Sequence, residues 1–200
     1  MALAALLALA LPGVGGTSET VVFESCDNHG KSIPARPDSG QVVLVTTVGD
    51  QHSQQIRYNP EILPRLSTNA RLFFYAHQCA RLGFGEAAAA ARRADCVALN
   101  TLLDGKQLNY RDLPALQTEL QFSPEEWSLL PGPPRNIDLT NCRPSTGDVL
   151  RVPLAREASP QQDAWNSCVR SCADRLWNCR KSGADACQLA YDQCRSNCRE

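Results

Sequence analysis

The alternation of apolar and polar residues predicts a small sheet early in the chain. Residues 42–48 read VVLVTTV, a β-branched run typical of a strand. Residues 55–58 alternate polar with apolar side chains before Asn59 and Pro60, which predicts a second, shorter strand. Residues 49–53 could close a hairpin between the two strands.

From residue 67 onward the apolar spacing becomes helical. Apolar side chains recur at intervals of three and four residues from Leu72 to Ala80, which predicts a helix over 67–82. Ser123, with Glu126 three residues later, forms a capping-box pattern at the start of another helix. The other elements expected before residue 155 are an alanine-rich helix over 86–103, short helices over 110–120 and 124–130, and an edge strand over 136–139.

Charge and hydropathy exclude two classes of protein. The chain has 20 Lys and Arg against 21 Asp and Glu, a net charge of −1, so no basic field is available for a nucleic acid. No apolar run reaches the roughly 18–20 residues that span a bilayer, so we expect no transmembrane span. Neither a phosphate-binding loop nor a dinucleotide fingerprint is present, and we expect no cofactor.

The cysteine content indicates an oxidising compartment. Ten of the 200 residues are cysteines, an even number far above that of cytosolic proteins. Residues 1–11 read MALAALLALAL and precede a Pro- and Gly-rich break, which predicts a signal segment over 1–16 although a basic start is missing. We therefore expect a periplasmic or secreted protein. The alternative for this segment is an apolar helix packed on the fold.

A change of composition near residue 160 divides the chain. We expect a domain over 17–154, a polar, Pro-containing linker over 155–162 and a separate cysteine-rich unit over 163–200. Six of the ten cysteines lie in this last segment.

The spacing of these six cysteines predicts an antiparallel helical hairpin. Successive intervals of 4, 7, 8, 7 and 4 residues form a palindrome centred on Gly183, and facing positions sum to 366. Offsets of 4, 7 and 11 residues within each arm keep the sulfurs on one face of a helix. The expected disulfides are Cys168–Cys198, Cys172–Cys194 and Cys179–Cys187.

Two questions about this hairpin stay open. Cysteine pairs at i,i+4 on facing helices could instead hold zinc or copper(I) as thiolates. Trp165, Trp177 and Tyr191 could be exposed anchors for a partner or could pack between the helices.

Residues 77–81 read HQCAR on the helix expected over 67–82. Zinc peptidases with an HExxH helix use two His residues one turn apart as ligands and the Glu between them to activate water. With YNP at 58–60, ADC at 94–96 and PGPPR at 131–135, the segment from about residue 40 to 142 resembles exported bacterial proteins related to the gluzincin metallopeptidases. The resemblance implies an α+β, zincin-like domain with a small sheet and two central helices.

The same resemblance implies a site that has lost its chemistry. His77 matches the first zinc ligand, Gln78 replaces the general base, Arg81 replaces the second ligand, and the third falls on Ala91. Asp95 is retained, and we expect it to form a salt bridge with Arg81. We therefore expect no catalytic residue and no bound metal at this vestigial site.

The role of His77 and the pairing of the remaining cysteines follow from this comparison. His77 is either a buried, hydrogen-bonded core histidine or a residual ligand. The two facing helices carry Cys79 and Cys96, which implies a Cys79–Cys96 disulfide and leaves Cys26–Cys142 as the second. Alternatively, Cys79 is a reactive thiol.

The function expected from the sequence is non-catalytic. We expect an exported, metallopeptidase-like binding or scaffold protein that takes an unidentified protein or peptide partner in the old cleft or on the hairpin. One alternative is an active hydrolase with a non-standard site around His77. The other is a thiol- or metal-handling protein that uses the C-terminal cysteines.

Overall fold

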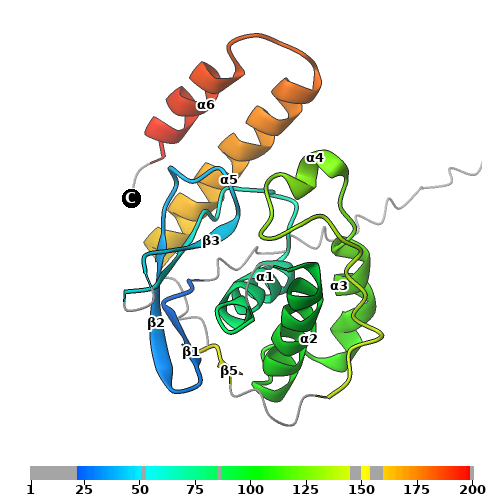
Figure 1. Cartoon of the computed structure of the whole chain (residues 1–200). Helices are drawn as coiled ribbons and strands as arrows, with labels where there is room; N and C mark the ends of the chain where they lie inside the picture. The colour runs from blue at the N-terminus through cyan, green and yellow to red at the C-terminus, as the bar shows by residue number, and fades with distance from the viewer. Residues whose placement is uncertain (1–21, 51–52, 85–86, 145–149, 154–159, 199–200) are drawn as a thin grey trace, which may run out of the picture.

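The computed structural model describes residues 22–50, 53–84, 87–144, 150–153 and 160–198, and this part of the chain is α+β. The sheet has five strands, and six helices accompany it (Figure 1). The strands are β1 (Ser25–Asn28), β2 (Lys31–Pro37), β3 (Val45–Val48), β4 (Gln55–Tyr58) and β5 (Leu150–Arg151). The helices are α1 (Thr68–Arg81), α2 (Ala88–Asp104), α3 (Leu113–Glu119), α4 (Pro124–Trp127), α5 (Pro160–Lys181) and α6 (Cys187–Ser196), with a 3-10 turn, η1 (Tyr110–Asp112).

The sheet is mixed, with the order β3-β4-β2-β1-β5. β3 and β4 pair antiparallel, which confirms the predicted hairpin, and β2 pairs with β4 in parallel. β1 and β2 form a second hairpin that the sequence pattern does not reveal. β2 reads KSIPARP, and only Ile33 and Ala35 of it are buried, so its apolar signal is weak. The turn between them places His29 and Gly30 in the left-handed region.

Helix α1 is the centre of the domain and packs against both the sheet and α2 (Figure 1). Eleven of its 14 residues are buried. The Ser67 side chain accepts a hydrogen bond from the backbone N–H of Ala70 and caps the helix. Because both faces of α1 are covered, the residues of the HQCAR segment lie inside the domain.

Three expected elements between residues 110 and 139 differ from those observed. The predicted helix over 110–120 is divided into η1 and α3, and the one over 124–130 ends at Trp127, although its capping box is present. The expected strand over 136–139 is wrong, since this segment is irregular. The Gln117 side chain donates to Ile137 O at 2.7 Å and accepts from Leu139 N at 2.8 Å. A side-chain amide therefore satisfies the backbone groups that a neighbouring strand would have paired.

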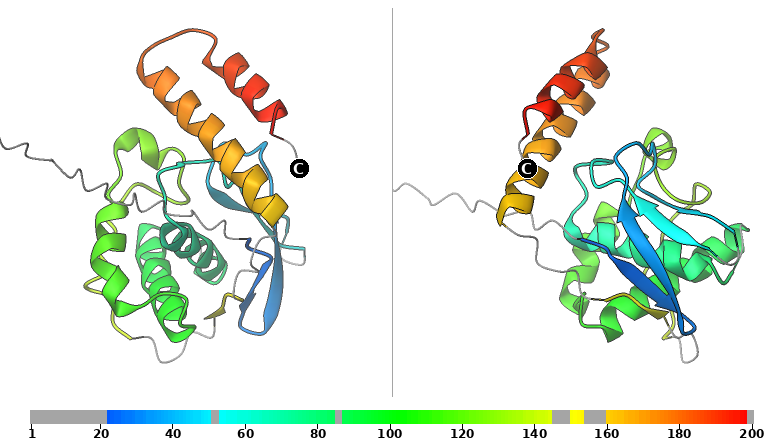
Figure 2. Two further views of the ribbon diagram at one scale, coloured as in Figure 1. Left: turned by 180° about the vertical axis from the view of Figure 1, so that it is seen from behind. Right: turned by 90° about the vertical axis from the view of Figure 1, so that its left-hand side faces the viewer.

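The C-terminal hairpin forms as the cysteine spacing predicts. Helices α5 and α6 run side by side and extend beyond the sheet-and-helix domain (Figure 2). The turn between them contains Gly183 in the left-handed region, with φ of 70°. The expected disulfides are confirmed: Cys168–Cys198, Cys172–Cys194 and Cys179–Cys187.

Two predicted segments lie wholly or mostly outside the described residues. They are the signal segment over 1–16 and the linker over 155–162, of which α5 already includes the last three residues. Within the described ranges, no helix combines the length and apolar character needed to cross a bilayer.

Candidate functional site

His77 lies in a buried cluster with Asp95 and Arg135. α1 supplies His77, α2 supplies Asp95, and the loop after α4 supplies Arg135. His77 Nδ1 lies 2.8 Å from Asp95 Oδ1, and Arg135 Nη2 lies 3.4 and 3.5 Å from the two ring nitrogens. The imidazole is completely buried, with 0% of its side chain exposed. His77 is therefore a buried, hydrogen-bonded core histidine.

Asp95 is held by Arg135 in a bidentate pair. Arg135 donates from Nε to Asp95 Oδ2 at 2.8 Å and from Nη2 to Asp95 Oδ1 at 2.7 Å. The structure pairs Asp95 with Arg135, so the prediction of an Asp95–Arg81 salt bridge is wrong. Arg135 is the last residue of the PGPPR motif at 131–135, but the motif alone does not indicate which carboxylate this arginine pairs with.

Arg135 also ties its own loop to the domain. Its guanidinium donates to the carbonyl oxygens of Pro131 and Pro133 at 3.4 and 3.2 Å and lies 5.1 Å from the centre of the Trp127 ring. Only 4% of the Arg135 side chain is exposed. One buried cation therefore joins α1, α2 and the loop.

Burial and neighbouring charges fix the protonation states. Burial lowers the pKa of His77, the carboxylate of Asp95 opposes this shift, and the cations of Arg135 and Arg81 add to it. Burial alone would raise the pKa of Asp95, but hydrogen bonds from Arg135 and His77 leave it below its usual value. The cluster accordingly contains a neutral imidazole that donates from Nδ1, an aspartate anion and a guanidinium cation.

The lowered pKa of His77 makes stability depend on pH. In the unfolded chain the imidazole takes up a proton near pH 6.5, whereas the folded protein resists protonation. The unfolding free energy should therefore fall as the pH drops below about 6.5, by at most about 1.4 kcal/mol per pH unit. Denaturant unfolding at pH 5.5, 6.5 and 7.5 measures this slope. His77→Gln should flatten it and the exposed control His29→Asn should retain it; equal slopes in all three proteins would contradict the assignment.

Gly132 is required because two guanidinium groups lie against its backbone. A Cβ at this position would lie 2.7 Å from Arg81 Nη1 and 3.3 Å from Arg135 Nη1. Its φ of 82° also lies in the left-handed region. Arg81 is itself buried, so the position that the resemblance assigns to a second zinc ligand contains a permanent cation packed under the loop.

We expect Gly132→Ala to destabilise the domain by about 2–3 kcal/mol, from backbone strain and crowding together. Gly30→Ala is the matched control, because Gly30 has a similar φ of 77° and nothing within 4 Å of the added Cβ. That control measures the strain alone, about 1–2 kcal/mol. Thermal and denaturant unfolding report both losses, and equal losses would show that the guanidinium groups move aside freely.

Gln78 and Ala91 are the two remaining positions that the resemblance assigns to a general base and a third zinc ligand. Gln78 Nε2 donates to Thr47 Oγ1 of β3 at 2.8 Å, so the amide lies between α1 and the edge strand rather than against His77. Its Oε1 is buried without a hydrogen-bond partner. Ala91 is fully buried in α2 and offers a methyl group. Neither side chain supplies a base or a metal ligand.

The disulfides of the domain differ from the expected pairs. The structure joins Cys26 to Cys79, and Cys96 to Cys142, so both the Cys79–Cys96 and the Cys26–Cys142 predictions are wrong. The reason is helical geometry. Residues two apart on an α-helix point roughly 200° apart, so Cys79 must face the sheet if His77 faces α2. All ten cysteines are paired, so the alternative of a reactive Cys79 thiol is also wrong.

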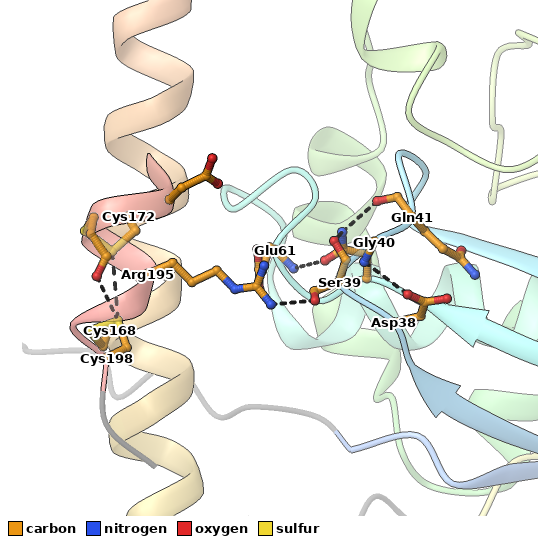
Figure 3. Close-up of polar contacts among 12 residues, drawn as sticks. Asp38, Ser39, Gly40, Gln41, Glu61, Cys168, Cys172, Arg195 and Cys198 are labelled. Atoms are coloured by element: carbon orange, nitrogen blue, oxygen red, sulfur yellow. Dashed lines mark hydrogen bonds and ion pairs between the residues drawn. A yellow bond between two sulfur atoms is a disulfide. The ribbon is translucent and has the colours of Figure 1, made fainter. Parts of the chain in front are cut away.

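Polar contacts of Arg195 join the hairpin to the domain (Figure 3). Arg195 of α6 donates from Nη2 to Ser39 Oγ at 2.6 Å, and its Nε lies 3.6 Å from Glu61 Oε1. Burial raises the pKa of Glu61, and Arg195 partly offsets this. Trp177 and Tyr191 line a groove of about 260 Å³ between the hairpin and the domain. These two aromatic residues therefore face the domain side of the hairpin.

No protein-family model, curated protein or solved structure matches this chain. The resemblance to gluzincin metallopeptidases therefore rests on the sequence motifs alone.

Proposed function

We propose that the protein is a non-catalytic, metallopeptidase-like binding or scaffold protein. The observation that carries this proposal is Arg135, whose guanidinium lies 3.4–3.5 Å from both ring nitrogens of His77. A permanent cation at this distance opposes a metal cation at the same imidazole. It also occupies the space next to the ring that a hydrolytic water would need.

The donor set does not fit zinc. A zinc site needs three protein ligands and an open position for water. His77 is one nitrogen donor, but its Nδ1 is bound to Asp95, and Arg81 and Ala91 stand at the other two ligand positions. The role of the His77–Asp95–Arg135 cluster is then to join α1, α2 and the Pro-rich loop.

Export to an oxidising compartment is part of the proposal. Five disulfides bind all ten cysteines, a pattern typical of secreted and periplasmic proteins and rare in the cytosol. In that compartment the disulfides stabilise the domain and the hairpin that bind the partner.

The groove between hairpin and domain is the surface that we assign to a protein or peptide partner. Its walls combine Trp177, Tyr191 and Leu176 of the hairpin with Val42 of the domain, and the Val42 side chain is exposed although apolar, at 75%. Aromatic residues that line a groove beside exposed aliphatic surface are typical of protein interfaces.

The test has a chemical arm. Protein purified without reductant should contain no stoichiometric zinc and should not hydrolyse a broad peptide library above background, with or without added Zn²⁺. One zinc per chain, together with hydrolysis that a chelator and His77→Ala both abolish, would overturn the proposal in favour of an active hydrolase.

The second arm locates the binding surface. A photo-crosslinking amino acid in place of Val42 should capture a discrete partner from the native envelope fraction. The same residue in place of Tyr110, which is equally exposed at 75% but lies outside the groove lining, is the control. Equal capture at both positions would contradict the assignment of the groove.

A further inference from the structure

Two disulfides at the open end of the hairpin bring their sulfur atoms close together. Cys168–Cys198 and Cys172–Cys194 lie one helical turn apart on α5 and α6. The Sγ atoms of Cys172 and Cys198 belong to different disulfides, yet they are 3.9 Å apart. The sulfurs of Cys168, Cys172 and Cys198 all lie within 4.8 Å of one another.

The distance between Cys172 Sγ and Cys198 Sγ is close to that in a tetrahedral thiolate site. Zinc binds thiolate sulfur at about 2.3 Å, so the sulfurs of a four-cysteine site are about 3.8 Å apart. The sulfur atoms of Cys172 and Cys198, which are 3.9 Å apart, are already close to this distance. Cys194 does not belong to the group of three, so after reduction its sulfur would reach the other three by rotation about its side-chain bonds.

The surroundings favour a negatively charged sulfur cluster. Arg175 Nη1 lies 3.9 Å from Cys194 Sγ, and a guanidinium beside a sulfur favours the thiolate form. A zinc ion with four thiolates has a charge of +2 − 4 = −2, which this cation partly neutralises. Beside the sulfurs, Cys172 and Ala173 of α5 and Tyr191 of α6 form a buried apolar contact between the two helices.

The third disulfide of the hairpin cannot form such a site. Cys179 and Cys187 lie next to the turn, and neither has another cysteine four residues away on its helix. They provide two sulfurs, whereas a closed zinc site needs four ligands. This disulfide is therefore a matched control on the same hairpin.

We propose that the open end of the hairpin is a redox-dependent zinc site formed by Cys168, Cys172, Cys194 and Cys198. A dithiol reductant transfers two electrons and two protons to each disulfide and itself becomes a disulfide, so two dithiols yield four protein thiols. One Zn²⁺ then displaces four protons and binds the four thiolates. The metal replaces two covalent links with one coordination centre. A small disulfide oxidant that takes two electrons from each thiolate pair, and is itself reduced to thiols, restores the two protein disulfides and releases the metal.

The test uses the full chain and Co²⁺ as a spectroscopic substitute for Zn²⁺. A water-soluble phosphine replaces the dithiol, because dithiols themselves bind zinc. The comparison includes oxidised protein, reduced protein, reduced Cys168→Ser/Cys198→Ser and reduced Cys179→Ser/Cys187→Ser. Each double variant removes one complete disulfide of the hairpin.

We expect the reduced protein to bind one Co²⁺ per chain, with the intense visible absorption of a tetrahedral thiolate site, and Zn²⁺ to displace it. The control Cys179→Ser/Cys187→Ser should bind equally, Cys168→Ser/Cys198→Ser should lose about 100-fold or more in affinity, and oxidised protein should not bind. Equal affinity in the two variants would assign the metal to the cysteines of the domain and overturn the proposal. Absence of stoichiometric binding to the reduced protein would overturn it as well.

Discussion

Replacing Arg135 with alanine should lower the free energy of unfolding by about 3–5 kcal/mol. The substitution leaves the carboxylate of Asp95 buried without the two hydrogen bonds that now hold it, and an uncompensated buried charge has a cost of this size. It also removes the donors to two carbonyl oxygens of the Pro-rich loop. Denaturant unfolding followed by circular dichroism measures the loss.

Two controls separate the charge from general effects of truncation. Arg57→Ala removes an ion pair with Asp38 in which the arginine side chain is 45% exposed, and it should cost less than about 1 kcal/mol. The double variant Asp95→Leu/Arg135→Met removes both charges and should be more stable than Arg135→Ala. A double variant that is less stable than Arg135→Ala would show that packing, not the unpaired carboxylate, causes the loss.

Removal of the Cys26–Cys79 disulfide should have a similarly large effect. This disulfide closes a loop of 53 residues, for which the entropy of the unfolded chain predicts a loss of about 4 kcal/mol in the variant Cys26→Ala/Cys79→Ala. The comparison is Cys179→Ala/Cys187→Ala, which opens a loop of 8 residues and should cost about 2.5 kcal/mol. Unfolding of both proteins without reductant checks the difference.

The buried environment of the first pair adds to this difference. Cys26 and Cys79 are 1% and 0% exposed, so their loss also leaves a small space between β1 and α1. Equal losses in the two variants would mean that local packing and the denatured ensemble outweigh loop length.

The sequence predicted best those elements whose signal is local. The spacing of apolar residues located α1 to within one residue at each end, and the palindrome of cysteines gave the three disulfides of the hairpin. Both patterns depend on the geometry of a single helix or of two helices joined by a short turn. Long-range pairing has no such signal, which explains why β2, with its two prolines, was missed.

The candidate site was predicted in part. The resemblance predicts that Gln78, Arg81 and Ala91 stand in place of a base and two ligands, but the arginine that contacts His77 lies 58 positions further along the chain. Nothing in the helical pattern indicates that Arg135 rather than Arg81 would reach Asp95. The angle between Cys79 and His77 on α1 argues against a Cys79–Cys96 disulfide once His77 faces α2, but it does not choose between Cys26 and Cys142 as the partner of Cys79.

The mirrored spacing of the hairpin cysteines restricts how the gene can vary in length. One residue inserted between Cys168 and Cys179 would rotate part of α5 by about 100° and shift it by about 1.5 Å, so the disulfides on the two sides of the insertion could no longer form together. An insertion between Ser182 and Ala186 would leave both helices in register and only enlarge the turn. Homologous genes should therefore tolerate insertions and deletions at the tip of the hairpin and exclude them from its arms.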